Sequence, residues 1–316
     1  MRNLLLILRS NSVCVLWAAL FVGTLSTAQP RVSIVPRDGG LKRATERTRA
    51  SLRTDISMVL VPVTVIDASD RPVLDLPRDG FRVFEDNVEQ RIASFALEEG
   101  PVSLCFVFDA SSSMKSRMMA STSAIQQFLA MTMPGDEFAL VRFSDQAELL
   151  SDFTHDPDQI LASIAGTQPA GWTSLHDAIF SAAQQMKRAH NVRKALVILT
   201  DGEDNNSRYT EKEVRSLVRE SDVRVFSIGI FERPRLLEDL AADTGGHAFR
   251  VNKLKELPDV IDRLSRELRS EYMLGYVSNN PQNDGKFRKV RVELVQTLRR
   301  IPFSVYFRSG YYAPAD

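Results

Sequence analysis

The sequence predicts an α/β protein: a doubly wound, mostly parallel sheet inserted between β-rich segments that form a small β-sandwich. The middle of the chain alternates continuous apolar runs with helix-like stretches, which is typical of a sheet covered by helices on both faces. The flanking residues instead show the period-two alternation of half-buried strands. Because neither flank has enough strands to bury a face by itself, we expect the two flanks to pack together.

These patterns divide the chain into five parts. The predicted boundaries are 1–28 for a signal peptide, 29–54 for a basic linker, 55–100 for an N-terminal β segment, 101–270 for the central α/β domain, and 271–316 for a C-terminal β segment that packs with 55–100.

The first 28 residues have the pattern of a cleavable signal peptide. Arg2 gives a positive start, Val13–Val22 is a continuous apolar run, and Ser26-Thr27-Ala28 supplies small residues before a cleavage at Gln29. An uncleaved anchor helix is the alternative, but this run spans only ~15 Å, about half of a bilayer core. We therefore expect an extracytoplasmic protein (periplasmic, at the cell surface or secreted) with no stable membrane span after cleavage.

Charge and cysteine content restrict the classes of partner and site. Lys+Arg and Asp+Glu are both 40, and no basic stretch is interleaved with aromatic residues, so nucleic acid and acidic membranes are disfavoured partners. The linker at 29–54 is most simply solvated, and a basic surface-binding tail is the alternative. Cys14 lies in the predicted signal peptide and leaves Cys105 alone, which excludes a disulfide framework and a Cys-rich zinc site.

The flanking segments contain clear strand patterns. In Val59–Val65 the valines fall on one face, which is typical of a half-buried strand. The next two predicted strands, Phe81–Phe84 and Ile92–Leu97, are expected to be joined through Asp86-Asn87, whose short side chains tolerate positive φ. The further strands are Phe81–Phe84 and Ile92–Leu97 before the central domain, and Lys289–Leu294 and Phe303–Phe307 after it.

The central domain contains four apolar runs long enough for strands buried on both faces, with helices between them. The predicted strands are Val102–Phe108, Phe138–Phe143, Ala195–Leu199 and Val223–Ile230. The predicted helices are Met114–Met133, Leu175–Ala189, Glu211–Glu220 and Leu254–Leu268. In such folds the functional crevice lies at the carboxyl ends of the strands, so the loops that begin there are the candidate site.

Three of these loops are rich in hard oxygen ligands. One carries Asp109, Ser111 and Ser113, one carries Thr173 before a helix, and one carries Asp201 directly after a strand. Two carboxylates and three hydroxyls without a thiolate suit a small hard cation such as Mg²⁺, with Mn²⁺ or Ca²⁺ as alternatives, rather than zinc or copper. The sequence therefore predicts a site for one divalent metal ion.

The same residues resemble the metal-ion-dependent adhesion site (MIDAS) of von Willebrand factor A (VWA) domains. The shared pattern is Asp-x-Ser-x-Ser, a distant Thr in Gly-x-Thr-x-Leu-x-Asp-Ala, and Thr-Asp-Gly after a buried strand. The resemblance implies that residues 101–270 form a VWA domain. The resemblance implies that Ser111, Ser113 and Thr173 coordinate through their hydroxyls. Asp109 and Asp201 would act partly through bound water, which leaves one vertex open for an Asp or Glu of a protein partner.

The flanks resemble a bacterial subgroup, the acidobacterial-type VWFA-related proteins. The residues concerned are Asp79–Asp86, with the pattern Asp-Gly-Phe-x-Val-x-Glu-Asp, and Arg308–Tyr312, with the pattern Arg-x-Gly-Tyr-Tyr. This resemblance extends the likeness over nearly all of the mature chain. From the metal site we expect a protein-binding module with a cell-adhesion or other protein–protein interaction role and no enzymatic activity.

Other interpretations remain at single residues. Asp109 and Asp201 could cap helices, and the serines could satisfy turn backbone groups, although this does not explain why all of them converge. His176 could approach the metal, but a packed or solvated histidine is the simpler reading. Glu203–Asn206 could add a calcium site, with a solvated loop as the simpler reading.

Two other functions remain as alternatives to metal-dependent binding. The metal could serve only to stabilise the fold of a scaffold protein whose partners bind the β-sandwich. A metal-assisted hydrolase is less favoured, because the sequence has no Gly-x-Ser-x-Gly, no His-Glu-x-x-His and no second acidic pair.

Overall fold

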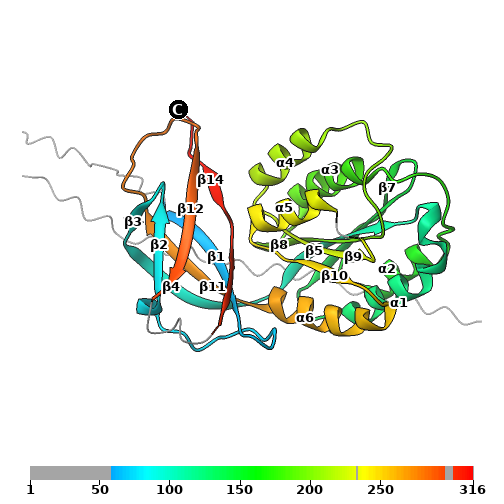
Figure 1. Cartoon of the computed structure of the whole chain (residues 1–316), viewed down its shortest axis with the longest axis horizontal. Helices are drawn as coiled ribbons and strands as arrows, with labels where there is room; N and C mark the ends of the chain where they lie inside the picture. Colours follow the sequence, from blue (N-terminus) through cyan, green and yellow to red (C-terminus); the bar gives the residue numbers. More distant parts are fainter. Residues whose placement is uncertain (1–57, 233, 296–301, 316) are drawn as a thin grey trace, which may run out of the picture. The chain divides into compact units, whose positions relative to one another are not determined.

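The computed structural model describes residues 58–232, 234–295 and 302–315. The predicted signal peptide (1–28), the basic linker (29–54) and the first residues of the N-terminal β segment (55–57) lie outside the described residues. Three sheets are described, one of six strands and two of four strands (Figure 1).

The six-stranded sheet has the strand order β10-β9-β8-β5-β6-β7. Every neighbouring pair is parallel except β6 and β7, which are antiparallel. The predicted fold class, a mostly parallel sheet with helices and flanking antiparallel sheets, is thereby confirmed. The strands are β5 (Val102–Asp109), β6 (Glu137–Phe143), β7 (Ala147–Thr154), β8 (Arg193–Thr200), β9 (Arg224–Ile230) and β10 (Ala248–Val251).

Six α-helices cover the two faces of this sheet (Figure 1). One face packs against α1, α2 and α6, and the other packs against α3, α4 and α5. The helices are α1 (Met118–Leu129), α2 (Pro157–Ala165), α3 (Leu175–Gln185), α4 (Glu211–Glu220), α5 (Arg235–Thr244) and α6 (Leu257–Arg269). Among the described residues, no helix is both long and apolar enough to cross a membrane.

Strand β5 shows why the apolar runs of the sequence are continuous. Successive side chains of a strand point to opposite faces, so Leu104 and Phe106 pack under α1 and α6 while Cys105 and Val107 pack under α3. Every residue of β5 is buried. Burial also raises the pKa of the Cys105 thiol to about 12, and the thiol is free.

The two four-stranded sheets have the orders β13-β1-β11-β4 and β14-β12-β2-β3. Both combine strands from before and after the α/β region, and one apolar cluster fills the space between them. Val59, Val61, Val63 and Val65 all point into this cluster, as their period-two spacing predicts. The strands are β1 (Met58–Ile66), β2 (Phe81–Glu85), β3 (Val88–Gln90), β4 (Ile92–Glu99), β11 (Ser270–Val277), β12 (Phe287–Leu294), β13 (Ser304–Phe307) and β14 (Gly310–Tyr312).

The turn at Asp86-Asn87 differs from its predicted connection. Both residues have positive φ, 46° and 68°, as expected, but the turn joins β2 to the short strand β3. Strand β4 pairs with β11 in the other sheet. A two-residue turn of this kind suits a tight hairpin, and β3 was too short to give a periodic signal.

Some elements of the α/β region were not predicted from the pattern. Met114–Met133 is not one helix, because Ser112–Ser116 forms a 3₁₀ turn and α1 begins at Met118. Strand β7 lies at the sheet edge and buries only Ser151, so its apolar alternation is weak. Helices α2 and α5 were not among the elements predicted from the pattern.

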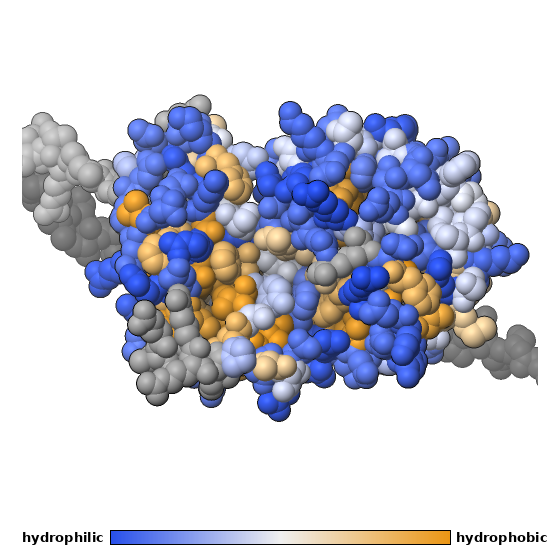
Figure 2. Space-filling model, viewed as in Figure 1, coloured by the Kyte–Doolittle hydropathy of each residue, from blue (hydrophilic) through white to orange (hydrophobic). Residues whose placement is uncertain are grey.

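The outer surface of the sandwich mixes apolar and charged side chains. Figure 2 shows hydrophobic and hydrophilic residues interspersed over β2, β12 and β14. The half-buried ring of Phe84 lies beneath the guanidinium groups of Arg291, at 4.1 Å, and Arg82, at 5.3 Å. Cationic side chains thus cover an outward-facing aromatic ring.

Candidate metal centre

The site lies at the carboxyl ends of β5 and β8, which are parallel neighbours at the middle of the sheet. Phe108 is paired with Leu199, so Asp109 at the end of β5 lies beside Thr200 at the end of β8. After each of these two strands the chain leaves the sheet and enters a loop. This register brings together two loops that are about ninety residues apart in sequence.

Four of the five predicted ligands form one hydrogen-bonded group. Ser111 donates its backbone N–H to Asp109 Oδ1 at 2.8 Å, and the hydroxyls of Ser111 and Ser113 lie 3.0 Å apart. The Ser113 hydroxyl donates to Asp201 Oδ1 at 2.7 Å. The alternation in Asp-x-Ser-x-Ser therefore directs three side chains to one point, which Asp201 reaches from the other loop.

Asp109 lies at the bottom of this group. Its side chain is completely buried, and Thr200 donates its hydroxyl to Asp109 Oδ2 at 2.6 Å. Burial raises the pKa of the Asp109 carboxyl, against the hydrogen bonds from Thr200 and Ser111, which lower it. A buried carboxylate whose nearest donors are neutral has unbalanced negative charge, which a cation would compensate.

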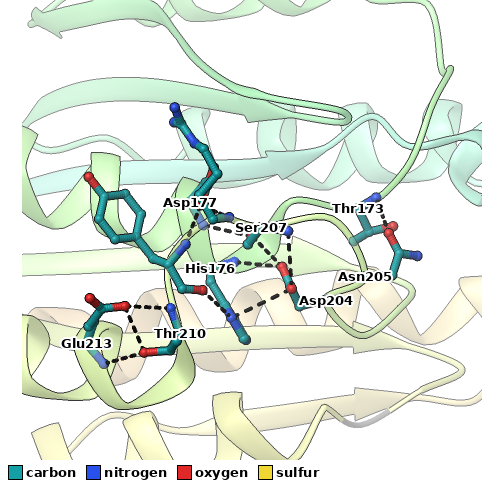
Figure 3. A network of polar contacts seen from close by, with 10 residues as sticks. Thr173, His176, Asp177, Asp204, Asn205, Ser207, Thr210 and Glu213 are labelled. Carbon is teal, nitrogen blue, oxygen red and sulfur yellow. Dashed lines mark hydrogen bonds and ion pairs between the residues drawn. The ribbon is translucent and has the colours of Figure 1, made fainter.

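Thr173 stands on a third loop that is hydrogen-bonded to the first. Ser112 donates its N–H to the Gly171 carbonyl at 3.1 Å. Thr173 donates its N–H to Asn205 Oδ1 at 2.8 Å and accepts from the Asn205 N–H at 3.0 Å (Figure 3). Thr173 is buried, and no hydrogen bond within the described chain joins its hydroxyl to the other four residues.

The loop that carries Thr173 is shaped by an aspartate from the β6–β7 turn. Trp172 donates its N–H to Asp145 Oδ1 at 2.7 Å. Gly171 has φ +80°, and a Cβ there would lie 2.5 Å from the Asp145 carboxylate. Trp172 itself is 65% exposed. A rigid backbone therefore presents a solvent-exposed indole next to Thr173.

His176 does not reach the four-residue group. Its backbone N–H donates to Asp204 Oδ1 at 3.1 Å, and its ring Nδ1 lies 3.1 Å from the Tyr209 carbonyl (Figure 3). Asp204 also accepts from the Ser207 hydroxyl. In the surface loop Glu203–Asn206, the Asp204 side chain thus fastens the loop to the start of α3. This packed role for His176 agrees with the simpler interpretation.

Arg117 is the residue that sequence reasoning missed. Its guanidinium forms an ion pair with Asp201 Oδ2, donates to the Ser113 carbonyl at 2.9 Å, and lies 4.9 Å from the centre of the Phe231 ring. Arg117 follows Ser113 by four residues, a spacing that permits contact across one helical turn. Nothing in the sequence indicates which way the Arg117 side chain points.

The residues present fit a hard divalent cation. Within the described ranges, no group of three or more His, Cys, Asp or Glu is placed to hold a metal. Any metal at this site would therefore depend on hydroxyl oxygens beside Asp109 and Asp201, and Ser111 and Ser113 supply them at close range. Carboxylate and hydroxyl oxygens are the ligands that Mg²⁺ and Mn²⁺ prefer.

Comparisons with known proteins agree with this fold. Residues 104–203 match the family model described as von Willebrand factor type A domain. No curated protein matches the chain.

The solved structures with this fold include proximal thread matrix protein 1 from the mussel byssus, with a TM-score of 0.51 and 20% identity over 58% of this chain and 51% of that chain. The chain thus spans about half the length of the mussel protein. A von Willebrand factor type A protein from Catenulispora acidiphila gives a TM-score of 0.49 and 11% identity over 83% of this chain and 75% of that chain. The vWF domain of the type V pili tip protein Mfa5 from Porphyromonas gingivalis gives a TM-score of 0.45 and 16% identity over 54% of this chain and 95% of that chain. At 20% identity the likeness to the mussel protein concerns the fold alone.

Proposed function

We propose that this chain, whose residues 104–203 match the von Willebrand factor type A domain model, is an exported, non-enzymatic binding protein that holds one divalent metal ion. The ligands are Asp109, Ser111, Ser113, Thr173 and Asp201, and the ion is Mg²⁺, with Mn²⁺ or Ca²⁺ as alternatives. The partner is a protein that supplies an Asp or Glu side chain. Export rests on the signal-peptide pattern of residues 1–28.

One observation carries the proposal. The Ser113 hydroxyl lies 3.0 Å from the Ser111 hydroxyl and 2.7 Å from Asp201 Oδ1, although Asp201 comes from a different strand. Hydroxyls that cap turns would bond to nearby backbone groups instead. Side chains that converge across the sheet in this way supply several oxygen ligands to one point.

Each residue would have a distinct task. Asp109 and Asp201 would supply two negative charges that balance those of a bound dication, while the serines would supply neutral oxygens. Ser113 is exposed at the surface, so the partner approaches from its side. Thr173 sits on the loop fixed by Asn205 and completes the ligand set. The metal supplies Lewis acidity that attracts an anionic oxygen of the partner.

The first experiment measures the metal. Calorimetric titration of the full chain with Mg²⁺ and Mn²⁺ should give one site, and Asp109→Ala should abolish binding at millimolar concentration. Ser112→Ala is the matched control, since Ser112 is exposed on the same loop and only its backbone is used. Metal at 100 times its Kd should also add about 2.7 kcal/mol to the free energy of unfolding. A wild-type chain that takes up no divalent ion would rule out the proposal.

The second experiment measures the partner. The immobilised full chain should retain a protein from envelope extract of its source organism in Mg²⁺ and release it in chelator. Thr173→Ala should reduce this retention more than it reduces metal affinity. If the same protein is retained equally in chelator and by Asp109→Ala, the metal serves only the fold, and the scaffold alternative is correct.

A further inference from the structure

We propose that Arg117 is a built-in cation of the candidate metal centre, which lowers its affinity for the metal and raises the affinity of the metal-loaded site for an anionic group. The inference rests on the proposed function and concerns a residue outside the predicted ligand set. Arg117 lies between the 3₁₀ turn Ser112–Ser116 and α1, four residues after Ser113.

The guanidinium and the serine ligand share one carboxylate. Asp201 Oδ1 accepts the Ser113 hydroxyl, and Asp201 Oδ2 is paired with Arg117. The Asp201 side chain is fully buried, and that of Arg117 is 24% exposed. Both oxygens of a proposed metal ligand are therefore occupied, one of them by a fixed positive charge.

The remaining contacts of Arg117 hold it loosely. Its Nε is buried without a hydrogen-bond partner among the described residues, and an unmet donor of this kind is unfavourable. The Ser113 carbonyl and the Phe231 ring are its other contacts. The charge of Asp201 is therefore the main attraction. When another cation engages that charge, the guanidinium can release Asp201 Oδ2 while it stays at the end of the same turn beside the site.

The ring of Phe231 lies beneath the Arg117 guanidinium, and the backbone of Phe231 has an unusual conformation. Its φ is +69°, which is a genuine outlier for a bulky residue, and its N–H donates to the Val251 carbonyl at 2.8 Å. Phe231 directly follows β9, so a further strand end contributes to the site. Strained residues of this kind persist where the surrounding structure fixes them, often at functional sites.

The electrostatic consequence has opposite signs for the two ligands. Asp109 and Asp201 together carry two negative charges, and Arg117 reduces the local total to one. A dication is attracted less strongly to such a site. Once a dication is bound, however, the local total is positive rather than neutral, so an anionic partner group is attracted more strongly.

Removing Arg117 changes the metal affinity in opposite directions if it competes with the metal and if it only orients Asp201. If Arg117 only held Asp201 in place, its removal would weaken metal binding. If Arg117 competes with the metal, its removal strengthens metal binding, because the opposing charge is gone and Asp201 Oδ2 is released.

The test uses the full chain with Mg²⁺ and Mn²⁺ as probes. We expect Arg117→Gln to raise the metal affinity at least tenfold by calorimetry, while Arg117→Lys, which keeps the charge, stays close to the wild type. Lys115→Gln is the matched control: it removes an exposed cation two residues away, and its effect should be less than a factor of two. The inference would be overturned if Arg117→Gln bound metal with the same affinity as the wild type or more weakly, while its circular dichroism and Tm showed a folded chain.

The anion half is tested with acetate on the Mn²⁺-loaded protein. At equal metal occupancy, the paramagnetic relaxation of acetate protons should be stronger with the wild type than with Arg117→Gln, and equal or reversed relaxation would overturn this half. Failure of the proposed function has a different signature, since then neither the wild type nor Arg117→Gln binds metal.

Discussion

Arg193 and Glu271 form a buried ion pair in which Arg193 Nε donates to Glu271 Oε1 at 3.0 Å. Their side chains are 7% and 3% exposed. Arg193 also donates to the carbonyls of Gly100, at 3.1 Å, and Arg269, at 3.0 Å, where the chain enters and leaves the α/β region. A single guanidinium on β8 thus ties both connections to the sandwich strand β11.

Glu271→Gln should destabilise the protein strongly. Glu271 lies between Arg193 and Arg224, whose Nη1 is 3.1 Å from Glu271 Oε2. The variant removes the counter-charge that pairs directly with both buried cations. We expect a loss of about 3–5 kcal/mol in the free energy of unfolding by urea denaturation. Glu89→Gln, which breaks an exposed pair with Arg82, is the control and should change little. Equal stability of the two variants would contradict this.

Asp177 should make stability depend on pH. Its carboxylate accepts the N–H groups of Arg208, at 2.9 Å, and Tyr209, at 3.1 Å, and also Arg208 Nε (Figure 3). Burial acts to raise the pKa of Asp177, but these hydrogen bonds outweigh it and the pKa is lowered below 3.8. The stabilisation is therefore complete above 3.8 and is lost as the pH falls through the lower, folded-state pKa.

Asp177→Asn should consequently cost about 1–3 kcal/mol near neutral pH and progressively less in acid. Urea denaturation of both proteins from pH 7 downward measures the difference. Glu203→Gln, on the exposed part of the same loop, serves as the control and should show no such dependence. A difference that grows toward acid would refute the assigned sign.

Cys105 should be chemically inert in the folded protein. The thiol is fully buried and its pKa is raised to about 12, so almost no thiolate exists at pH 8. In a Cys14→Ser background, iodoacetamide should modify Cys105 only after denaturant is added. A Val192→Cys substitution gives the accessible control, because Val192 is 84% exposed. Intact mass measures both, and native labelling of Cys105 at the control's rate would be inconsistent with the buried strand.

Gly171→Ala should disturb the third loop of the candidate metal centre. The new Cβ would meet the Asp145 carboxylate at 2.5 Å, and φ there is +80°. We expect a loss of more than about 1 kcal/mol in stability, together with weaker metal binding because Thr173 is displaced. Gly166→Ala is the matched control: nothing lies within 4 Å of its Cβ and its φ is −86°. Unchanged melting temperature and metal affinity in Gly171→Ala would show that the loop adapts.

The sequence determined those features that depend on local patterns. The valines from Val59 to Val65 alternate because one face of β1 is buried, and the residues of β5 are continuously apolar because both faces are buried. The positive φ of Asp86 and Asn87 follows from their short polar side chains. Asp109, Ser111, Ser113 and Asp201 could be chosen because strand ends of a parallel sheet meet at one edge.

The tertiary structure decided which distant groups meet. Nothing near β3 in the sequence indicates that β4 crosses to pair with β11, because strand pairing depends on burial across the whole core. The partners of Arg193 lie more than seventy residues from it. Arg117 could not be assigned to the metal centre from its neighbours in the sequence, because a long cationic side chain is usually solvated. Only the folded positions of Asp201 and Phe231 give it a buried counter-charge and an aromatic ring. The local sequence pattern indicates which residues are buried. The long-range contacts that set the charge of the candidate metal centre form only when the sheet is assembled.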